Sequence, residues 1–218
     1  MHRNEAEEHL RIIRSLMEKA TIYRAISAPT ALIAGLIATL TSMALNFATI
    51  SGENRNIAFF GSWFGALALT GFANAVFIWQ DAKRRGDSFI SPGMKMALIA
   101  LLPAHFTAGV ISVVAVVLST GPFFMPYVTL PLTWIALHRI GLLATTHFAP
   151  RSLVYLGWIF LLFGLAVFVN TTIGYRIERS LGLNEWQYGN ILMAVTFGGF
   201  HLIYAACTWP RNAAGRTA

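Results

Sequence analysis

Long apolar segments are the feature that most constrains the fold of this chain. Six stretches of predominantly apolar residues run over 26–50, 57–79, 94–119, 123–146, 152–172 and 186–208. A helix needs roughly 20 such residues to cross the hydrocarbon core of a bilayer. Membrane β-strands alternate polar and apolar residues over about ten positions, whereas these stretches are apolar throughout. The sequence therefore predicts an all-α, polytopic membrane protein with a bundle of six transmembrane helices.

Composition agrees with a lipid environment and argues against nucleic-acid binding. Of the 218 residues, 56% are hydrophobic and only 11% are charged, and the mean hydropathy is +0.60. A soluble domain usually carries about a quarter charged residues. The formal net charge of +7 arises from Lys and Arg between the apolar segments, and not from the single basic face that a nucleic-acid-binding domain presents. The expected partner is the lipid bilayer.

The distribution of Lys and Arg predicts the orientation in the membrane. Thirteen of these residues lie on the same side as the N-terminus, and only Arg55, Arg176 and Arg179 lie on the other. Cytoplasmic connections carry the excess of Lys and Arg in membrane proteins. An even number of spans independently places both ends on one side. We therefore expect the N- and C-termini to be cytoplasmic.

The segment before the first apolar stretch predicts an amphipathic helix. Asn4 and Glu7 have the spacing of a capping box. Apolar residues then recur on one helical face at Leu10, Ile13, Met17 and Ala20. This helix could lie on the bilayer or pack across the bundle, or residues 4–24 could dock a cytoplasmic or membrane protein partner. The expected organisation is an amphipathic helix over 1–25, a transmembrane domain over 26–208 and a cytoplasmic tail over 209–218.

Small and polar residues recur at helical spacing in several of the apolar stretches. Helices in lipid associate through small residues, because these let the backbones approach closely. The stripes are Gly35, Thr39, Ser42 and Asn46; the GxxxG pair Gly61 and Gly65; His105, Gly109 and Ser112; Pro131, Trp134, His138, Gly141 and Thr145; and Ala194, Gly198, His201 and Ala205. Each stripe is predicted to face the interior of the bundle. Association with a second copy of the chain is left open.

Three histidines lie within predicted spans at similar depth, and each falls on one of these inner stripes. His105, His138 and His201 could therefore meet. Imidazoles bind transition metals and carry protons near neutral pH, so the three are candidate ligands for zinc or haem. No Asp or Glu lies within a predicted span to orient the rings or act as a general base. The alternatives are three separate, hydrogen-bonded histidines or a site that handles protons or substrate.

Arg139 follows His138 directly but falls on another side of the helix. It shares that side with Leu132, Ile135 and Leu143, which predicts a lipid-facing surface. A long basic side chain can extend from such a position to the membrane interface. The alternative is that Arg139 binds an anion, a substrate or a lipid headgroup.

The remaining patterns leave the activity open. The chain has one cysteine, Cys207, so it has no intramolecular disulfide and no CxxC motif, and no nucleotide-binding or nucleophile motif occurs. The segments EEHLRIIRSLMEKATIYRAIS and FGGFHLIYA resemble those of a family of six-span bacterial integral membrane proteins that carries no established activity. The resemblance implies an inner-membrane location. The leading hypothesis is a non-enzymatic interaction or sensory protein; the alternatives are a haem- or metal-binding protein and a small transporter or channel.

Overall fold

The structure is a computed structural model that describes residues 7–10, 12–13, 28–50, 54–86, 92–119, 127–146, 149–173 and 177–209. Its described elements are helices. They are α2 (Ala28–Phe47), α3 (Arg55–Arg85), α4 (Pro92–Ser119), α5 (Thr129–Ala144), α6 (Arg151–Thr172), α7 (Ile177–Ser180), α8 (Glu185–Met193), the π-helix η2 (Ala194–Phe200) and α9 (His201–Thr208). The prediction of an all-α fold is confirmed for this part of the chain.

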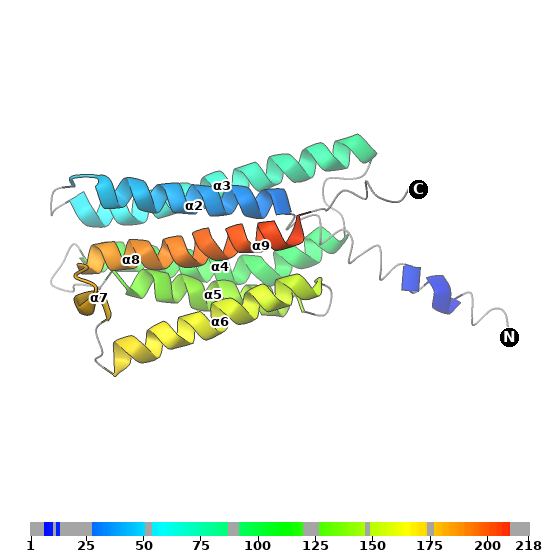
Figure 1. Cartoon of the computed structure of the whole chain (residues 1–218). Coiled ribbons are helices and arrows are strands. Elements are labelled where there is room, and N and C mark those ends of the chain that lie inside the picture. Colours follow the sequence, from blue (N-terminus) through cyan, green and yellow to red (C-terminus); the bar gives the residue numbers. More distant parts are fainter. Residues whose placement is uncertain are drawn as a thin grey trace, which may run out of the picture.

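The long helices lie side by side along one direction (Figure 1). Helices α2 and α3 form one side of the bundle and α6 the other, with α4, α5 and the α8–η2–α9 segment between them. Successive helices run in opposite directions, so Ala28 and Thr208 lie at the same end of the bundle. The short helix α7 lies at the opposite end. Each predicted apolar stretch thus corresponds to a helical segment of the bundle.

Five helical segments are long and apolar enough to cross a membrane. The sixth, α5, has 16 residues and spans about 24 Å at 1.5 Å per residue, which is less than the roughly 30 Å of a typical hydrocarbon core. Helix α3 is longer than its predicted span and continues to Arg85. The chain therefore has the helices of a multi-pass membrane protein, although one of the six is short.

The predicted N-terminal amphipathic helix falls mostly outside the described residues. Residues 7–10 and 12–13 are helical and exposed, including Leu10, Ile12 and Ile13. The rest of the segment 1–25, with Asn4 of the predicted capping box, lies outside the description, as does the tail after Trp209. An amphipathic helix over this segment therefore stays a prediction.

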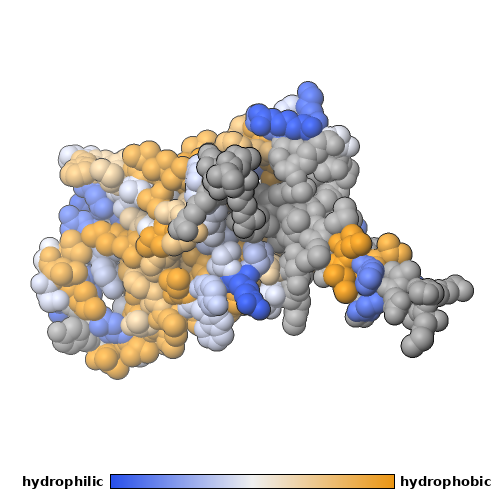
Figure 2. Space-filling view, turned by 45° about the vertical axis from the view of Figure 1, so that its right-hand side comes forward, coloured by the Kyte–Doolittle hydropathy of each residue, from blue (hydrophilic) through white to orange (hydrophobic). Residues whose placement is uncertain are grey.

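The outer surface of the bundle is largely apolar. Figure 2 shows hydrophobic residues over much of the visible face, with hydrophilic residues gathered in separate patches. Large apolar side chains are exposed along several long helices; they include Phe72 on α3, Phe106 on α4, Leu162 on α6 and Ile203 on α9. Apolar residues that face outward in this way are suited to lipid rather than to water.

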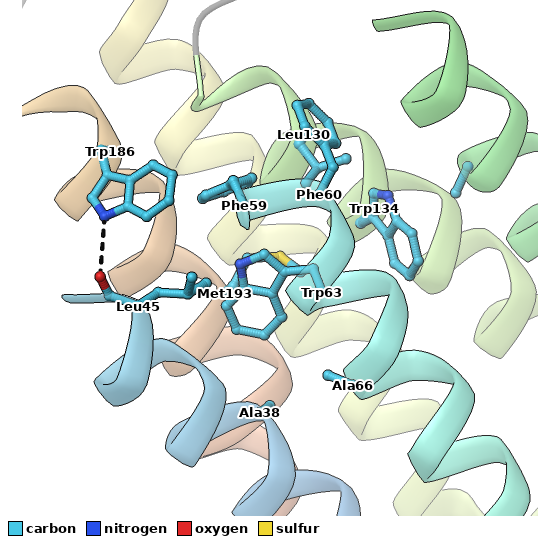
Figure 3. Close-up of a cluster of buried hydrophobic side chains, with 11 residues drawn as sticks. Ala38, Leu45, Phe59, Phe60, Trp63, Ala66, Leu130, Trp134, Trp186 and Met193 are labelled. Atoms are coloured by element: carbon cyan, nitrogen blue, oxygen red, sulfur yellow. Dashed lines mark hydrogen bonds between the residues drawn. The ribbon is translucent and has the colours of Figure 1, made fainter. Parts of the chain in front are cut away.

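Large aromatic side chains fill the core between α3, α5 and α8. Phe59 is fully buried and packs edge-on against Trp186, with ring centroids 5.4 Å apart. Trp186 also donates its indole hydrogen to the carbonyl oxygen of Leu45 across 3.4 Å, as Figure 3 shows. Trp63 points into the same cluster from α3. Aromatic packing therefore determines which face of α3 turns inward.

The GxxxG pair of α3 lies on the opposite face, which corrects the prediction that it packs inward. Gly61 and Gly65 are exposed, and a Cβ atom added at either position would have no other atom within 4 Å. Phe59 and Trp63 occupy the buried face instead. The prediction failed because burying large aromatic side chains outweighs the benefit of close backbone approach on this helix.

Two of the other small-residue stripes, that of α2 and that of the last span, meet at a close helix contact, as predicted. A Cβ atom at Gly198 of η2 would lie 2.6 Å from Thr39 Oγ1 of α2. A Cβ atom at Gly35 would lie 3.0 Å from the Gly198 carbonyl oxygen. Helix α2 therefore approaches η2 so closely that only glycine fits at the two facing positions.

Candidate functional site

Three histidines from three helices meet in the interior of the bundle. His105 comes from α4, His138 from α5, and His201 is the first residue of α9. The ring centroids of His105 and His138 lie 5.2 Å apart, and those of His138 and His201 lie 5.7 Å apart. The sequence predicted that these rings could meet, and the structure brings them together with His138 at the centre.

A hydrogen bond between two of the imidazoles fixes the tautomer of each neutral ring. His105 Nδ1 lies 2.8 Å from the carbonyl oxygen of Leu101. A carbonyl oxygen only accepts, so this nitrogen carries the hydrogen. Nε2 of neutral His105 is then the acceptor, and His138 Nδ1 donates to it across 3.1 Å. The second ring nitrogen of His138, Nε2, is therefore left with a bare lone pair.

Aromatic side chains pack against the His138 ring that carries this bare nitrogen. His138 Nε2 is buried without a hydrogen-bond partner among the described residues, as is His201 Nδ1. The His138 ring packs edge-on against Phe160 and Phe197, with centroid distances of 4.9 Å and 5.3 Å. Leaving a buried polar group unpaired costs about 1–3 kcal/mol. The site therefore has unused capacity for a proton or for another hydrogen-bond donor.

A close contact between α4 and α5 holds the His105–His138 pair together. Gly141 lies three residues after His138, on the same side of α5, and a Cβ atom there would lie 3.0 Å from Leu101 Cδ2 and 3.6 Å from Ala104 Cβ. Leu101 and Ala104, which precede His105 in the chain, lie on the side of α4 that faces Gly141 of α5. Because Gly141 has no side chain, the backbones of α4 and α5 can approach closely enough for the imidazoles of His105 and His138 to form a direct hydrogen bond.

The third histidine is positioned by a π-helix. The segment Ala194–Phe200 forms i→i+5 hydrogen bonds, and His201 follows it directly. Short π-helical segments within α-helices are frequent at functional sites, because the wider turn re-aims the residues beside it. Here the turn also places Phe197 against both His138 and His201, with centroid distances of 5.3 Å and 6.2 Å. Neither the π-helix nor the two phenylalanines at the cluster, Phe160 and Phe197, were predicted from the sequence.

Several polar side chains nearer the α7 end of the bundle form hydrogen bonds between helices. Trp63 Nε1 donates to Asn190 Oδ1 across 3.1 Å, and Ser42 Oγ donates to the Asn190 carbonyl oxygen across 2.9 Å. Trp134 Nε1 donates to Ser112 Oγ across 2.8 Å. Asn190 is fully buried, and its side-chain Nδ2 lacks a partner, as do the Oδ1 atoms of Asn46 and Asn170 toward this end. The sequence signal for Asn190 was a polar residue inside the last apolar stretch, and it was not recognised.

Arg139 does not lie on a lipid-facing stripe, which corrects the prediction about its face. Ile135, on the same side of α5, is fully buried, and its Cγ2 lies 2.7 Å from where a Cβ atom at Gly164 of α6 would be. Leu143 also contacts α6, at Gly157. Arg139 is half-buried along this α5–α6 contact. The prediction failed because apolar residues line both lipid-facing and buried surfaces of a membrane helix.

The described residues hold no group of three or more His, Cys, Asp or Glu arranged to bind a metal ion. Nε2 of His105 already accepts a hydrogen bond from His138. The three rings therefore do not direct three free nitrogens at one point, as a tri-histidine zinc site requires. Binding of zinc or haem by His105, His138 and His201 stays a prediction.

No protein-family model, curated protein or solved structure matches this chain. The role of the histidine cluster is therefore inferred from its geometry and chemistry. Those features are a hydrogen-bonded imidazole pair, a third imidazole beside it, and an unpaired basic nitrogen within aromatic walls.

Proposed function

We propose that this chain is a non-enzymatic sensory protein of a bacterial inner membrane, with the three histidines as its proton-responsive element. The observation that carries the proposal is the bare, buried Nε2 of His138 beside two further imidazoles. Histidine is the side chain whose charge changes most readily between pH 5 and 8. The carboxylates of Glu178 and Glu185 belong to α7 and to the start of α8, at the end of the bundle away from the cluster.

The membrane placement that we propose has six spans and two cytoplasmic ends. Five long apolar helices and the shorter α5 support the six spans. Most of the described cations lie at the end of the bundle where α3 ends and α6 begins, whereas Arg55 and Arg179 belong to the other end. Those at the first end are Lys83, Arg84, Lys95, Arg139 and Arg151. That end would face the cytoplasm, because cytoplasmic connections carry the excess of Lys and Arg. The resemblance to six-span bacterial proteins supports the inner membrane.

Uptake of one proton would change the cluster in two ways. It would convert Nε2 of His138 from an acceptor into a donor, and it would place a positive charge next to His105 and His201. Among the described residues, these two imidazoles are the titratable groups that face His138. The ring contacts that it makes with α6 and η2 are to the uncharged rings of Phe160 and Phe197. The cluster would have to rearrange to pair the new donor and to spread the charge. Because Phe197 belongs to η2, that rearrangement would reach the last span.

The output that we propose is contact with a partner protein through residues 4–24. These residues carry alternating charges on one face of the predicted helix and apolar residues on the other. If they dock a partner, deletion of residues 1–24 abolishes capture of that partner from solubilised membranes. Unchanged capture would rule out this segment as the contact surface.

The proton-responsive element is tested by the pH dependence of thermal unfolding in detergent. A charge on His138 has no described carboxylate to neutralise it in the folded protein, whereas an unfolded imidazole takes up the proton freely. The unfolding midpoint of the wild type should therefore fall as the pH is lowered from 8 to 5. His138→Gln should reduce this pH-dependent shift measurably, because an amide does not titrate in this range.

His9→Gln is the matched control, because His9 is exposed on the N-terminal segment. It should leave the pH-dependent shift unchanged. If His138→Gln and His9→Gln behave alike, the cluster is not the proton-responsive element.

A metal- or haem-binding protein is the second candidate function, favoured by the convergence of three imidazoles. An absorption spectrum and a metal analysis of the purified chain decide it. A Soret band, or one metal ion per chain that is lost in His138→Gln, would replace the proton-based proposal. A small transporter or channel would instead show flux into liposomes that depends on His138.

A further inference from the structure

Arg139 lies at the contact between α5 and α6, within the predicted membrane. Its helical neighbours Ile135 and Leu143 contact Gly164 and Gly157 of α6, so its side chain emerges along the line where the two helices meet. The residue is half-buried. An arginine that extends to the membrane interface from a lipid-facing side of its helix would have lipid on both sides. Arg139 instead has the protein surface of α6 beside it.

The positive charge of Arg139 is not compensated within the described part of the chain. No hydrogen bond or ion pair joins its guanidinium group to another described residue. A guanidinium group has five N–H donors in a planar fork that matches the oxygens of a phosphate group. In a largely apolar setting, this unsatisfied set of donors favours an anionic ligand.

The shortness of α5 places Arg139 at a depth that lipid phosphates can reach. Arg139 precedes the last helical residue, Ala144, by five positions, which is about 8 Å along the helix axis at 1.5 Å per residue. A span shorter than the hydrocarbon thickness thins the bilayer locally and draws the headgroups inward. An extended arginine side chain covers much of the remaining distance.

We propose that Arg139 binds the phosphate of an anionic phospholipid at the α5–α6 contact. The proposal rests on the membrane placement given above, with this end of the bundle in the anionic cytoplasmic leaflet. Exposed apolar side chains such as Ile140 on α5 and Ile159 on α6 would contact the acyl chains. These apolar surroundings favour a lipid over free phosphate, because a small hydrated anion gains nothing from them.

Native mass spectrometry of the full chain tests the proposal, with phosphatidylglycerol and phosphatidylcholine presented in equal amounts. The wild type should retain phosphatidylglycerol preferentially. Arg139→Gln should lower this retention roughly tenfold or more, because it removes charge-assisted hydrogen bonds. Arg139→Lys should fall between the two, since it keeps the charge but loses the planar fork. If Arg139→Gln does not fold by circular dichroism and gel filtration, Arg139→Lys carries the test alone.

Arg151→Gln is the matched control, because Arg151 is an exposed cation at the start of α6 on the same end of the bundle. It should leave the preference for phosphatidylglycerol intact. Equal loss in Arg139→Gln and Arg151→Gln would show attraction to the whole basic end and overturn the site. Unchanged retention in folded Arg139→Gln or Arg139→Lys would also overturn it. Equal protection against thermal unfolding by inorganic phosphate and by phosphatidylglycerol would assign the site to a free anion.

The lipid-binding test and the test of the proposed function can fail independently of each other. His138→Gln should retain phosphatidylglycerol like the wild type, since it leaves the guanidinium group unchanged. A wild type that shows lipid selectivity but no pH response would reject the sensory role alone. A wild type that shows the pH response but no lipid selectivity would reject the lipid site alone.

Discussion

Two pairs of glycines in this protein have opposite roles in the structure, although all four belong to small-residue stripes in the sequence. Gly35 and Gly198 face each other where α2 crosses η2, and a side chain at either position would collide with the partner helix. Gly61 and Gly65 form a regular GxxxG on α3, yet the space around both is open. Small residues therefore mark a helix contact only where the opposite helix also offers a flat surface.

The largest expected effect is at the α2–η2 crossing. Gly198→Leu places a branched side chain where even a Cβ atom would lie 2.6 Å from Thr39 Oγ1. Overpacking of this kind typically costs about 1–3 kcal/mol and sometimes more. We expect a strongly lowered unfolding midpoint in detergent, or loss of the folded protein from the membrane fraction. A normal midpoint would show that α2 and η2 are not in close contact.

A smaller effect is expected from Gly35→Ala at the same crossing. The added Cβ atom would lie 2.7 Å from Leu202 Cγ, which is on a flexible side chain, and 3.0 Å from the Gly198 carbonyl oxygen, which is not. We expect a loss of about 1–2 kcal/mol in the free energy of unfolding, because only part of the strain can relax. Unfolding in a denaturing detergent measures the loss. Combining this change with Gly198→Ala should give a non-additive effect, since the two sites share one contact.

The smallest effect is expected on α3. Gly61→Leu and Gly65→Leu add side chains into open space and should change the free energy of unfolding by no more than about 0.5 kcal/mol. The same thermal unfolding measurement applies, and it should be repeated over a range of protein concentrations. A large loss that grows with protein concentration would contradict this expectation and indicate that a second copy covers this face.

The sequence was sufficient to identify the long helices of the bundle and several of their inward-facing sides. Trp134, His138, Gly141 and Thr145 share one side of α5, and the structure buries that side as the spacing predicts. Helical periodicity establishes which residues share a face, because neighbours on that face recur every three or four positions. Small and polar residues then distinguish an inward-facing side from a lipid-facing one.

Apolar residues do not distinguish an inward-facing side of a helix from a lipid-facing one. Ile135 is fully buried and Ile140, on the same helix, is half-exposed, although both are isoleucine. In water, hydrophobicity separates core from surface; in lipid, both environments are apolar and the signal is lost. The side of α5 that carries Arg139 was misassigned for this reason, and the aromatic face of α3 was overlooked in favour of its glycines.

The histidine cluster was only partly predictable. Similar depth and inward direction made a meeting of the three rings reasonable, but their contact depends on how the helices are rotated against each other. The direct bond between His105 and His138 depends on the close approach at Gly141, and the position of His201 depends on a π-helix. Neither the helix pairing nor the wider turn has a signature in hydrophobic spacing.

The π-helix sets the rotational register of everything that follows it. Each residue of an α-helix turns the chain by about 100°. Removing a single residue from Ala194–Phe200 would let the turn tighten and would swing the imidazole of His201 away from its neighbours. Tyr204 and Ala205, both buried, would be carried outward by the same rotation. The length of this one segment, more than the identity of any side chain in it, therefore decides whether two imidazoles or three share the interior.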